Sequence, residues 1–182
     1  NFAHSPTPPP TQEATETAID EEAPSPLTLE EQERINPSNV NAMNPVAVMT
    51  TNYGVIELEL FTDTMPVTAG NFVKLAEEGF YDGTKFHRVI DNFMIQGGGL
   101  DVSFTPKPTR PPIENEANNG LKNTVGALAM ARTNDPHSAS SQFFINVVDN
   151  PTLDHRGKQS GRTWGYAVFG RVTEGMDVVD AI

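Results

Sequence analysis

The residue types in one short stretch, residues 86–99, are suited to chemistry on a peptide. Its sequence is FHRVIDNFMIQGGG, which places one arginine and one glutamine among aromatic and aliphatic residues. If its two halves are strands joined by a turn at the Asp-Asn pair, side chains alternate between faces, and Arg88, Met94 and Gln96 point the same way. A cation, an amide and an apolar side chain on one face suit a ligand that carries an apolar group next to a peptide carbonyl.

Two further motifs follow in the chain, SQFFI at residues 141–145 and WGYAVFG at residues 164–170. The three motifs in this order resemble the cyclophilin family of peptidyl-prolyl cis/trans isomerases, and the resemblance runs from about residue 46 to residue 182. It implies a mainly β fold, a closed antiparallel eight-stranded barrel capped by two helices. It also implies an enzyme that rotates X-Pro peptide bonds (EC 5.2.1.8) without a cofactor.

The resemblance makes Arg88 the catalytic residue. Rotation of an X-Pro bond is slow because amide resonance sets a barrier of about 18–20 kcal/mol. A charged donor aimed at the prolyl nitrogen stabilises the twisted bond, in which the lone pair of that nitrogen is no longer conjugated. Arginine is charged at every working pH, and its planar fork can also contact a carbonyl. From the residues alone, an ion pair with Asp91 or another acid is the more ordinary role for Arg88.

The resemblance also implies which residues bind the substrate. Gln96 would hold a substrate carbonyl, and the strand edge at Ala131 and Arg132 would pair with the peptide backbone. The family usually has asparagine or another small polar residue where Arg132 stands, so the backbone contact carries over better than the side chain. Gln142 would support this edge or contact the peptide. Four apolar residues, of a kind more often found in plain core, would form the proline-ring pocket: Phe93, Met94, Phe144 and Leu153.

Two positions depart from the drug-binding cyclophilins. Tyr166 stands where those proteins have histidine; it keeps an aromatic wall with a polar tip, as in bacterial-type cyclophilins, and completes the expected substrate-binding residues. Thr152 replaces a tryptophan just before Leu153. Because this removes a large apolar surface and an indole N–H, we expect weak cyclosporin binding.

The overall charge limits the partners. The 182 residues carry a formal net charge of -12, and no cluster of Lys and Arg is present to neutralise phosphates, so nucleic acid is not an expected partner. No apolar run approaches the roughly 20 residues needed to span a bilayer. The chain has no cysteine, which excludes disulfides and thiol catalysis. Its histidines lack metal-ligand spacing, so no metal site is expected.

Residues 1–45 differ in composition from the rest of the chain. They hold eight of the 15 prolines, and eight acidic residues against a single arginine. With few large apolar residues, such a segment cannot offset the entropy of ordering, so we expect a disordered or docked extension ahead of a cyclophilin-like domain over residues 46–182. One exception is a Thr-x-x-Glu capping box, which predicts a short helix over residues 28–35.

The extension also bears on location and partners. A spacer rich in proline and acid, in a chain that begins at Asn1 rather than methionine, is typical of a processed precursor. We therefore expect a periplasmic or exported protein, with the cytoplasm as the alternative. The X-Pro pairs of the extension could also contact the site of its own or a neighbouring domain.

Periodicity predicts the elements that position the site. The clearest strand pattern, residues 53–61, alternates apolar residues with glutamates, and a helix is predicted to run from Pro66 to about Glu78. Cyclophilins return a last strand to the barrel after a second helix, but this sequence stops within that helix, so we expect the final strand to be missing from it. The other predictions are strands near 86–89, 94–97, 127–130, 143–147 and 167–172, a helix from Met176 to Ile182, and a first-helix apolar face of Ala69, Phe72, Val73 and Ala76.

The sequence thus predicts a peptidyl-prolyl isomerase that acts on proline-containing unfolded or flexible polypeptides and assists protein folding. The alternative is a proline-peptide-binding chaperone or scaffold module whose turnover is incidental. The presence of both Arg88 and Gln96 favours the enzyme, since a binding module needs only the pocket and the strand edge.

Overall fold

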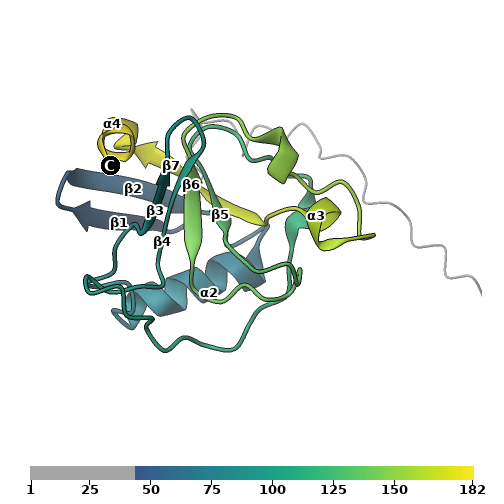
Figure 1. The fold of residues 1–182 in the computed structure, drawn as a ribbon, viewed down its shortest axis with the longest axis horizontal. Coiled ribbons are helices and arrows are strands. Elements are labelled where there is room, and N and C mark those ends of the chain that lie inside the picture. Colours follow the sequence, from purple (N-terminus) through teal and green to yellow (C-terminus); the bar gives the residue numbers. More distant parts are fainter. Residues whose placement is uncertain (1–43) are drawn as a thin grey trace, which may run out of the picture.

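The structure is a computed structural model that describes residues 44–182. The helix predicted over residues 28–35 lies outside the described residues. The described chain forms one curled antiparallel sheet of seven strands in the order β1-β2-β7-β5-β6-β4-β3 (Figure 1). The strands are β1 (Val46–Thr51), β2 (Gly54–Leu60), β3 (Arg88–Ile90), β4 (Met94–Gly97), β5 (Ala127–Met130), β6 (Phe143–Asn146) and β7 (Val168–Glu174).

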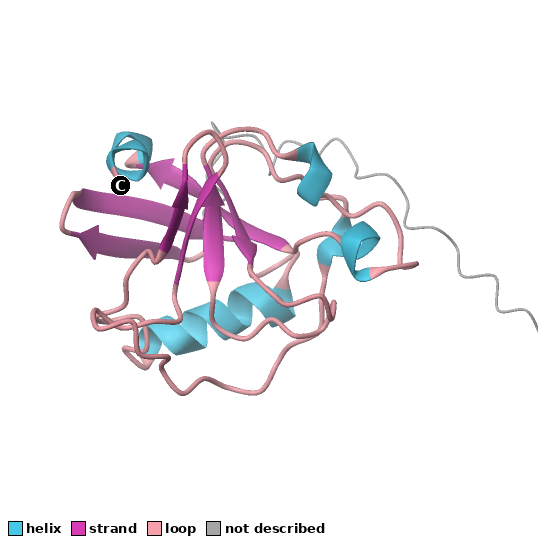
Figure 2. Cartoon of the chain, viewed as in Figure 1, coloured by secondary structure: helices cyan, strands magenta, loops and turns pink. Residues whose placement is uncertain are grey.

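Helices make up a small part of the described chain (Figure 2). The longest, α2, lies across one end of the sheet in Figure 1. The chain is therefore mainly β, as predicted, and helices form at the two predicted places that lie within residues 44–182. The helices are α2 (Pro66–Glu77), α3 (Gly161–Trp164) and α4 (Met176–Ala181), with 3-10 turns η1 (Ala117–Asn119) and η2 (Pro151–Leu153).

The alternating pattern of β2 buries one face of the strand. Ile56, Leu58 and Leu60 are at most 1% exposed and belong to the core of the sheet. β2 pairs along its whole length with β1, a strand that the sequence analysis missed. The sequence of β1 is VAVMTT, in which apolar and polar residues do not alternate, so the period of two is absent.

The glutamate at position 59 does not face solvent, although the alternation of β2 predicts that it does. Glu59 is 0% exposed because it lies opposite Arg171 of β7. The Glu59 Oε2 atom is 2.7 Å from Nε and 2.6 Å from Nη2 of Arg171. Its Oε1 atom accepts a hydrogen bond of 3.0 Å from the side chain of Asn44. A buried, hydrogen-bonded ion pair thus joins two neighbouring strands.

The prediction of which residues form the buried face of α2 was wrong at one position. Ala69 and Phe72 are buried, but Ala76 is exposed and Leu75 is buried instead. The buried stripe follows the spacing i, i+3, i+6, centred on Phe72, whose ring lies 5.4 Å from that of Phe143 on β6. Packing against this aromatic ring therefore decides how the helix is turned.

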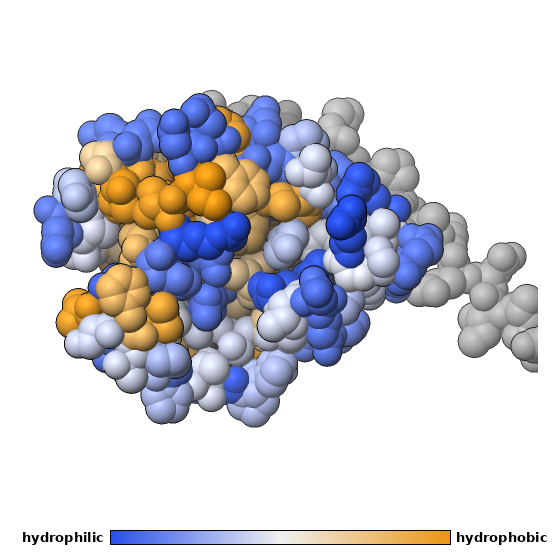
Figure 3. All heavy atoms as spheres, viewed as in Figure 1, coloured by the Kyte–Doolittle hydropathy of each residue, from blue (hydrophilic) through white to orange (hydrophobic). Residues whose placement is uncertain are grey.

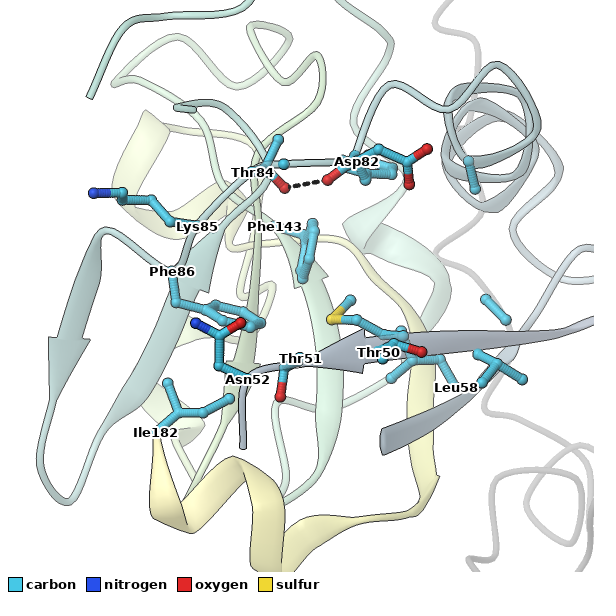
Figure 4. Close-up of a pocket in the computed structure, with 18 of the residues that line it drawn as sticks. Thr50, Thr51, Asn52, Leu58, Asp82, Thr84, Lys85, Phe86, Phe143 and Ile182 are labelled. Carbon is cyan, nitrogen blue, oxygen red and sulfur yellow. Dashed lines mark hydrogen bonds between the residues drawn. The ribbon is translucent and has the colours of Figure 1, made fainter. Parts of the chain in front are cut away.

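The sheet is not closed into a barrel within residues 44–182. β1 pairs only with β2, and β3 pairs only with β4, so each leaves one edge unpaired. A hollow of about 780 Å³ lies between β1 and the segment that leads into β3, and it is lined in part by Phe86, Phe143 and Ile182. Figure 4 shows the two aromatic rings pointing into this hollow. Within residues 44–182 the predicted mainly β, antiparallel architecture is thus confirmed as a curled sheet of seven strands with a gap.

The ion pair between β2 and β7 yields a stability prediction. Arg171→Ala should lower the free energy of unfolding by about 3–5 kcal/mol, because it removes the charge partner of a buried carboxylate. Urea denaturation measures this change. The matched control is Arg162→Ala, which removes an exposed arginine and should change stability by less than about 0.5 kcal/mol. A loss no larger than that of the control would contradict the prediction.

Candidate active site

The hairpin of β3 and β4 places the chemistry-bearing residues on one face. In its register Arg88 lies opposite Gln96, and Ile90 lies opposite Met94. Residues directly opposite each other in an antiparallel pair share a face. The hairpin turn includes Asn92 at φ +53°, a backbone conformation that asparagine tolerates better than most residues. The predicted common face of Arg88, Met94 and Gln96 is therefore confirmed.

Two hydrogen bonds link Arg88 to the neighbouring strand. Nη1 of Arg88 donates to Oε1 of Gln96 at 3.3 Å, and Nε2 of Gln96 donates to Oε1 of Gln142 at 3.0 Å. Arg88 forms no ion pair with any of residues 44–182, and the carboxylate of Asp91 instead accepts from Asn92. The guanidinium is exposed, so it is able to reach a ligand.

The glycines after β4 make room for this arrangement. A side chain at Gly99 would place its Cβ 2.5 Å from Cγ of Gln142. Gly98 has φ +82°, and a Cβ there would lie 2.9 Å from the carbonyl oxygen of Ser141. The triple glycine thus lets the end of β4 approach the start of β6 closely. This leaves room for the side chain of Gln142, which orients Gln96.

The expected pocket residues gather on the same side of the sheet. Met94 and Phe144 are 2% and 4% exposed, and Phe144 lies opposite Gln96 on the neighbouring strand. The ring of Tyr166 packs edge-on against that of Phe144, with 5.7 Å between the ring centres. The backbone N–H of Tyr166 donates to the carbonyl of Leu153 at 2.9 Å. Strand and loop residues thus converge on one apolar wall.

Phe93 and Leu153 are half-buried and are tied together through Asn150. The Asn150 side chain donates to the carbonyl of Phe93 at 2.9 Å, and its own carbonyl accepts from the N–H of Leu153 at 3.0 Å. Asn150 also donates to the side chain of Asn146, which is fully buried. The sequence analysis missed this support, and the only signal for it is the density of Asn and Asp between β6 and η2.

The strand edge expected to bind peptide is at the end of β5. The N–H of Ala131 donates to the carbonyl of Gln142 at 2.9 Å, so the ladder with β6 continues to this residue. One residue further on, the backbone N–H and C=O of Arg132 form no hydrogen bond with residues 44–182. They are the kind of unpaired groups that an extended peptide can join. The carbonyl of Gln142 thus pairs with the residue just before this edge.

The side chain of Arg132 lies at the border of the site. Its guanidinium is 4.5 Å above the ring of Tyr166. Partial burial lowers the pKa of Arg132, an effect that its neighbours Tyr166 and Asp135 oppose. The guanidinium group of arginine nevertheless stays charged in proteins.

The surface at the site is mixed in character. In Figure 3 an apolar band lies over the upper ends of β3 and β4, and a hydrophilic patch lies directly below it. Val89 and Ile90 of β3 are 50% and 37% exposed and contribute to the apolar surface of this hairpin. Within residues 44–182 no group of three His, Asp or Glu side chains is placed to hold a metal ion, and no helix is long and apolar enough to cross a membrane. The arrangement can hold an apolar ring beside a cation and an amide.

Comparisons with known proteins agree with this geometry. Residues 46–182 match the family described as Cyclophilin type peptidyl-prolyl cis-trans isomerase/CLD. The chain is 58% identical over 132 residues to peptidyl-prolyl cis-trans isomerase B of Escherichia coli, covering 72% of this chain and 80% of that protein. It is also 58% identical over 134 residues to peptidyl-prolyl cis-trans isomerase cyp18 of Streptomyces antibioticus, covering 74% of this chain and 80% of that protein.

Solved structures show the same fold. A Cryptosporidium parvum cyclophilin-type peptidyl-prolyl cis-trans isomerase, crystallised in the presence of the dipeptide Ala-Pro, matches with a TM-score of 0.61 and 28% identity, covering 75% of this chain and 84% of that one. Cyclophilin AquaCyp293 from Hirschia baltica matches with a TM-score of 0.65 and 26% identity, covering 85% of this chain and 74% of that one. The family match extends over the whole sheet and every residue of the site, and the chain belongs to the cyclophilin-type peptidyl-prolyl cis-trans isomerases.

Proposed function

We propose that the chain catalyses cis/trans isomerisation of X-Pro peptide bonds in unfolded or flexible polypeptides, with Arg88 as the catalytic residue. The observation that carries the proposal is an exposed guanidinium on the same face as a buried apolar wall, with no acid paired to it in residues 44–182. Because it has no carboxylate partner there, its charge is available to the substrate.

The roles of the other residues follow from the same geometry. Gln96 is held between Arg88 and Gln142, so its amide is already oriented when a substrate carbonyl arrives. The unpaired backbone groups of Arg132 hold the peptide in an extended form next to the pocket. The proline ring occupies the apolar wall formed by Phe93, Met94, Phe144, Leu153 and Tyr166.

Rotation then proceeds by differential binding of the twisted bond. As the amide twists, the lone pair of the prolyl nitrogen becomes able to accept a hydrogen bond, which the planar forms cannot do equally well. A charged donor that contacts this nitrogen stabilises the twisted form over both planar forms. No bond is broken and no cofactor is needed.

A proline-peptide-binding chaperone or scaffold module remains the alternative function. It would use the pocket and the strand edge but would not need an oriented cation. Both functions serve protein folding, and the clients of either are proline-containing polypeptides.

Arg88→Ala separates the enzyme from the binding module. This variant should lower kcat/KM on an Ala-Ala-Pro-Phe peptide by about 100- to 1000-fold, because the donor to the prolyl nitrogen is lost. A protease-coupled or NMR exchange assay measures the rate, and the unfolding curve should match that of the wild type. Arg162→Ala, which removes the same charge from an exposed site, should keep full activity. An Arg88→Ala variant that keeps more than about a third of the turnover would remove Arg88 from the mechanism.

We also propose that cyclosporin binds weakly, since Thr152 is a small exposed residue next to Leu153 in η2. Thr152→Trp should tighten inhibition by about 1–3 kcal/mol, through a new aromatic contact, and should leave peptide turnover nearly unchanged. Inhibition constants for both proteins, measured in the same peptide assay, test this. Nanomolar inhibition of the unsubstituted protein would contradict it.

We propose, in addition, that one further extended segment closes the sheet between β1 and β3 into an eight-stranded barrel. The support is the unpaired edge of each of these two strands, and a hollow that is bordered by β1 and by the residues just before β3. Amide hydrogen exchange should then be slow at the β1 and β3 amides that do not bond to β2 or β4. If these amides exchange as fast as the amides of the exposed residues Val102 and Thr109, which form no hydrogen bond with residues 44–182, the gap stays open.

For residues 1–45 we propose an acidic, proline-rich extension of the cyclophilin domain at residues 46–182. Its composition suits a spacer in a periplasmic or otherwise exported protein, with the cytoplasm as the alternative. Its X-Pro pairs are weak ligands for the site of the same or a neighbouring domain, raised in effective concentration by the tether.

A further inference from the structure

The guanidinium of Arg132 connects the end of β5 to the segment that carries Tyr166. Nη2 of Arg132 donates to the carbonyl of Gly161 at 2.6 Å and to that of Gly165 at 2.7 Å. Nε donates to the same Gly165 carbonyl at 3.1 Å, and Nη1 donates to the carbonyl of Thr133 at 2.9 Å. The charge of this side chain is thus directed at backbone carbonyls and not at a carboxylate.

Two of these carbonyls belong to a segment that has little regular structure of its own. Gly161 begins the single turn of α3, and Gly165 follows its last residue. A helix this short is not stable alone, and the carbonyls at a helix end lack partners within the helix. A cation at this end satisfies them and interacts favourably with the helix dipole. Arg132 supplies three of the hydrogen bonds at the end of α3. Asn115 also donates to the Gly165 carbonyl at 3.3 Å, and the ring of His155 bonds to the Trp164 carbonyl at 2.8 Å.

The segment is also pressed against its surroundings at both glycines. A Cβ on Gly161 would lie 2.1 Å from the carbonyl oxygen of Asn134, and a Cβ on Gly165 would lie 2.4 Å from the backbone nitrogen of His155. Gly165 has φ +69°, which disfavours any other residue. The close approach at Gly161 brings this segment against the residues that follow Arg132, within reach of its guanidinium.

Tyr166, an aromatic residue of the pocket wall, directly follows the backbone that Arg132 holds. Tyr166 follows Gly165 in the chain. The centre of its ring lies 4.5 Å from Cζ of Arg132 and 5.7 Å from the centre of the Phe144 ring. One residue thus holds both the backbone before Tyr166 and the ring itself. The backbone of the same residue, Arg132, offers the unpaired groups expected to bind peptide.

We propose that Arg132 is a positioning residue that holds Tyr166 against Phe144. It thereby sets the position of the pocket wall that contacts the proline ring of the substrate. This inference rests on the proposed function of the site. The pocket wall binds the proline ring in the planar and the twisted forms alike, so a displaced wall weakens binding of all forms. Loss of such uniform binding raises KM and leaves kcat unchanged. A residue that merely stabilises the fold would change neither value at temperatures where the protein is folded.

The test compares Arg132→Ala, Arg132→Lys and the exposed-arginine control Arg162→Ala in the full chain. On an Ala-Ala-Pro-Phe peptide, Arg132→Ala should raise KM about tenfold with kcat within about twofold of the wild type. Arg132→Lys keeps the charge but has no planar fork to reach two carbonyls, so its KM should rise at least about threefold. The control should match the wild type in both constants.

Trp164 supplies an independent readout, because it is the only tryptophan of the chain and lies at the end of α3. Acrylamide quenching of its fluorescence should increase in Arg132→Ala and stay unchanged in Arg162→Ala. Urea denaturation establishes that each variant is folded under the assay conditions.

A wild-type KM in Arg132→Ala, or a fall in kcat with KM unchanged, would overturn the inference. If the wild type itself shows no turnover, the proposed function fails, and the inference is then decided by peptide affinity. In that case an NMR titration with the same peptide should give a Kd about tenfold weaker for Arg132→Ala than for the control, and an equal Kd would overturn it.

Discussion

The pairing of β4 with β6 is the contact on which the site depends. It sets Gln96 opposite Phe144 and Gly97 opposite Phe143. Because neighbouring residues of a strand face opposite ways, a slip of β6 by one residue against β4 would turn Phe144 inward and bring Phe143 to the outer face, next to Gln96. The register is held from inside, where the ring of Phe143 packs against that of Phe72 in α2. Packing of the core thus decides which side chains meet a substrate.

The site combines two kinds of support. Arg88 and Gln96 stand on paired strands, whose backbone ladder fixes their positions directly. Leu153 and Tyr166 come from η2 and from the segment after α3, where no ladder fixes the backbone. Polar side chains fix the backbone there instead, as Asn150 does by joining the segment of Leu153 to the turn between β3 and β4. Buried polar groups that are fully hydrogen-bonded can specify one conformation in this way.

Features that depend on neighbours along the chain could be predicted from the sequence. The common face of Arg88 and Gln96 follows from a period of two within one hairpin, and the motifs around it were specific enough to predict the family. The buried state of Glu59 could not be predicted, because its partner Arg171 lies 112 residues away. The alternation of residues within one strand does not show which side chains the neighbouring strand places opposite it. The same limit applies to the hydrogen bond between Gln142 and Gln96. It depends on the close approach of the triple glycine to Gln142, and a run of glycines in a sequence does not show what it packs against.

Arg132 illustrates how one position can carry two constraints of different origin. The backbone contact to a peptide would be kept by any residue that continues β5, so it places no demand on the side chain. A short polar side chain could not reach the carbonyls of Gly161 and Gly165, whereas the long planar fork of arginine reaches both. The identity of the residue is therefore set by the segment that ends in Tyr166 and not by the peptide. In the proposed mechanism the shape of the pocket wall depends on Arg132 and rotation depends on Arg88, so binding and rotation are governed by different residues.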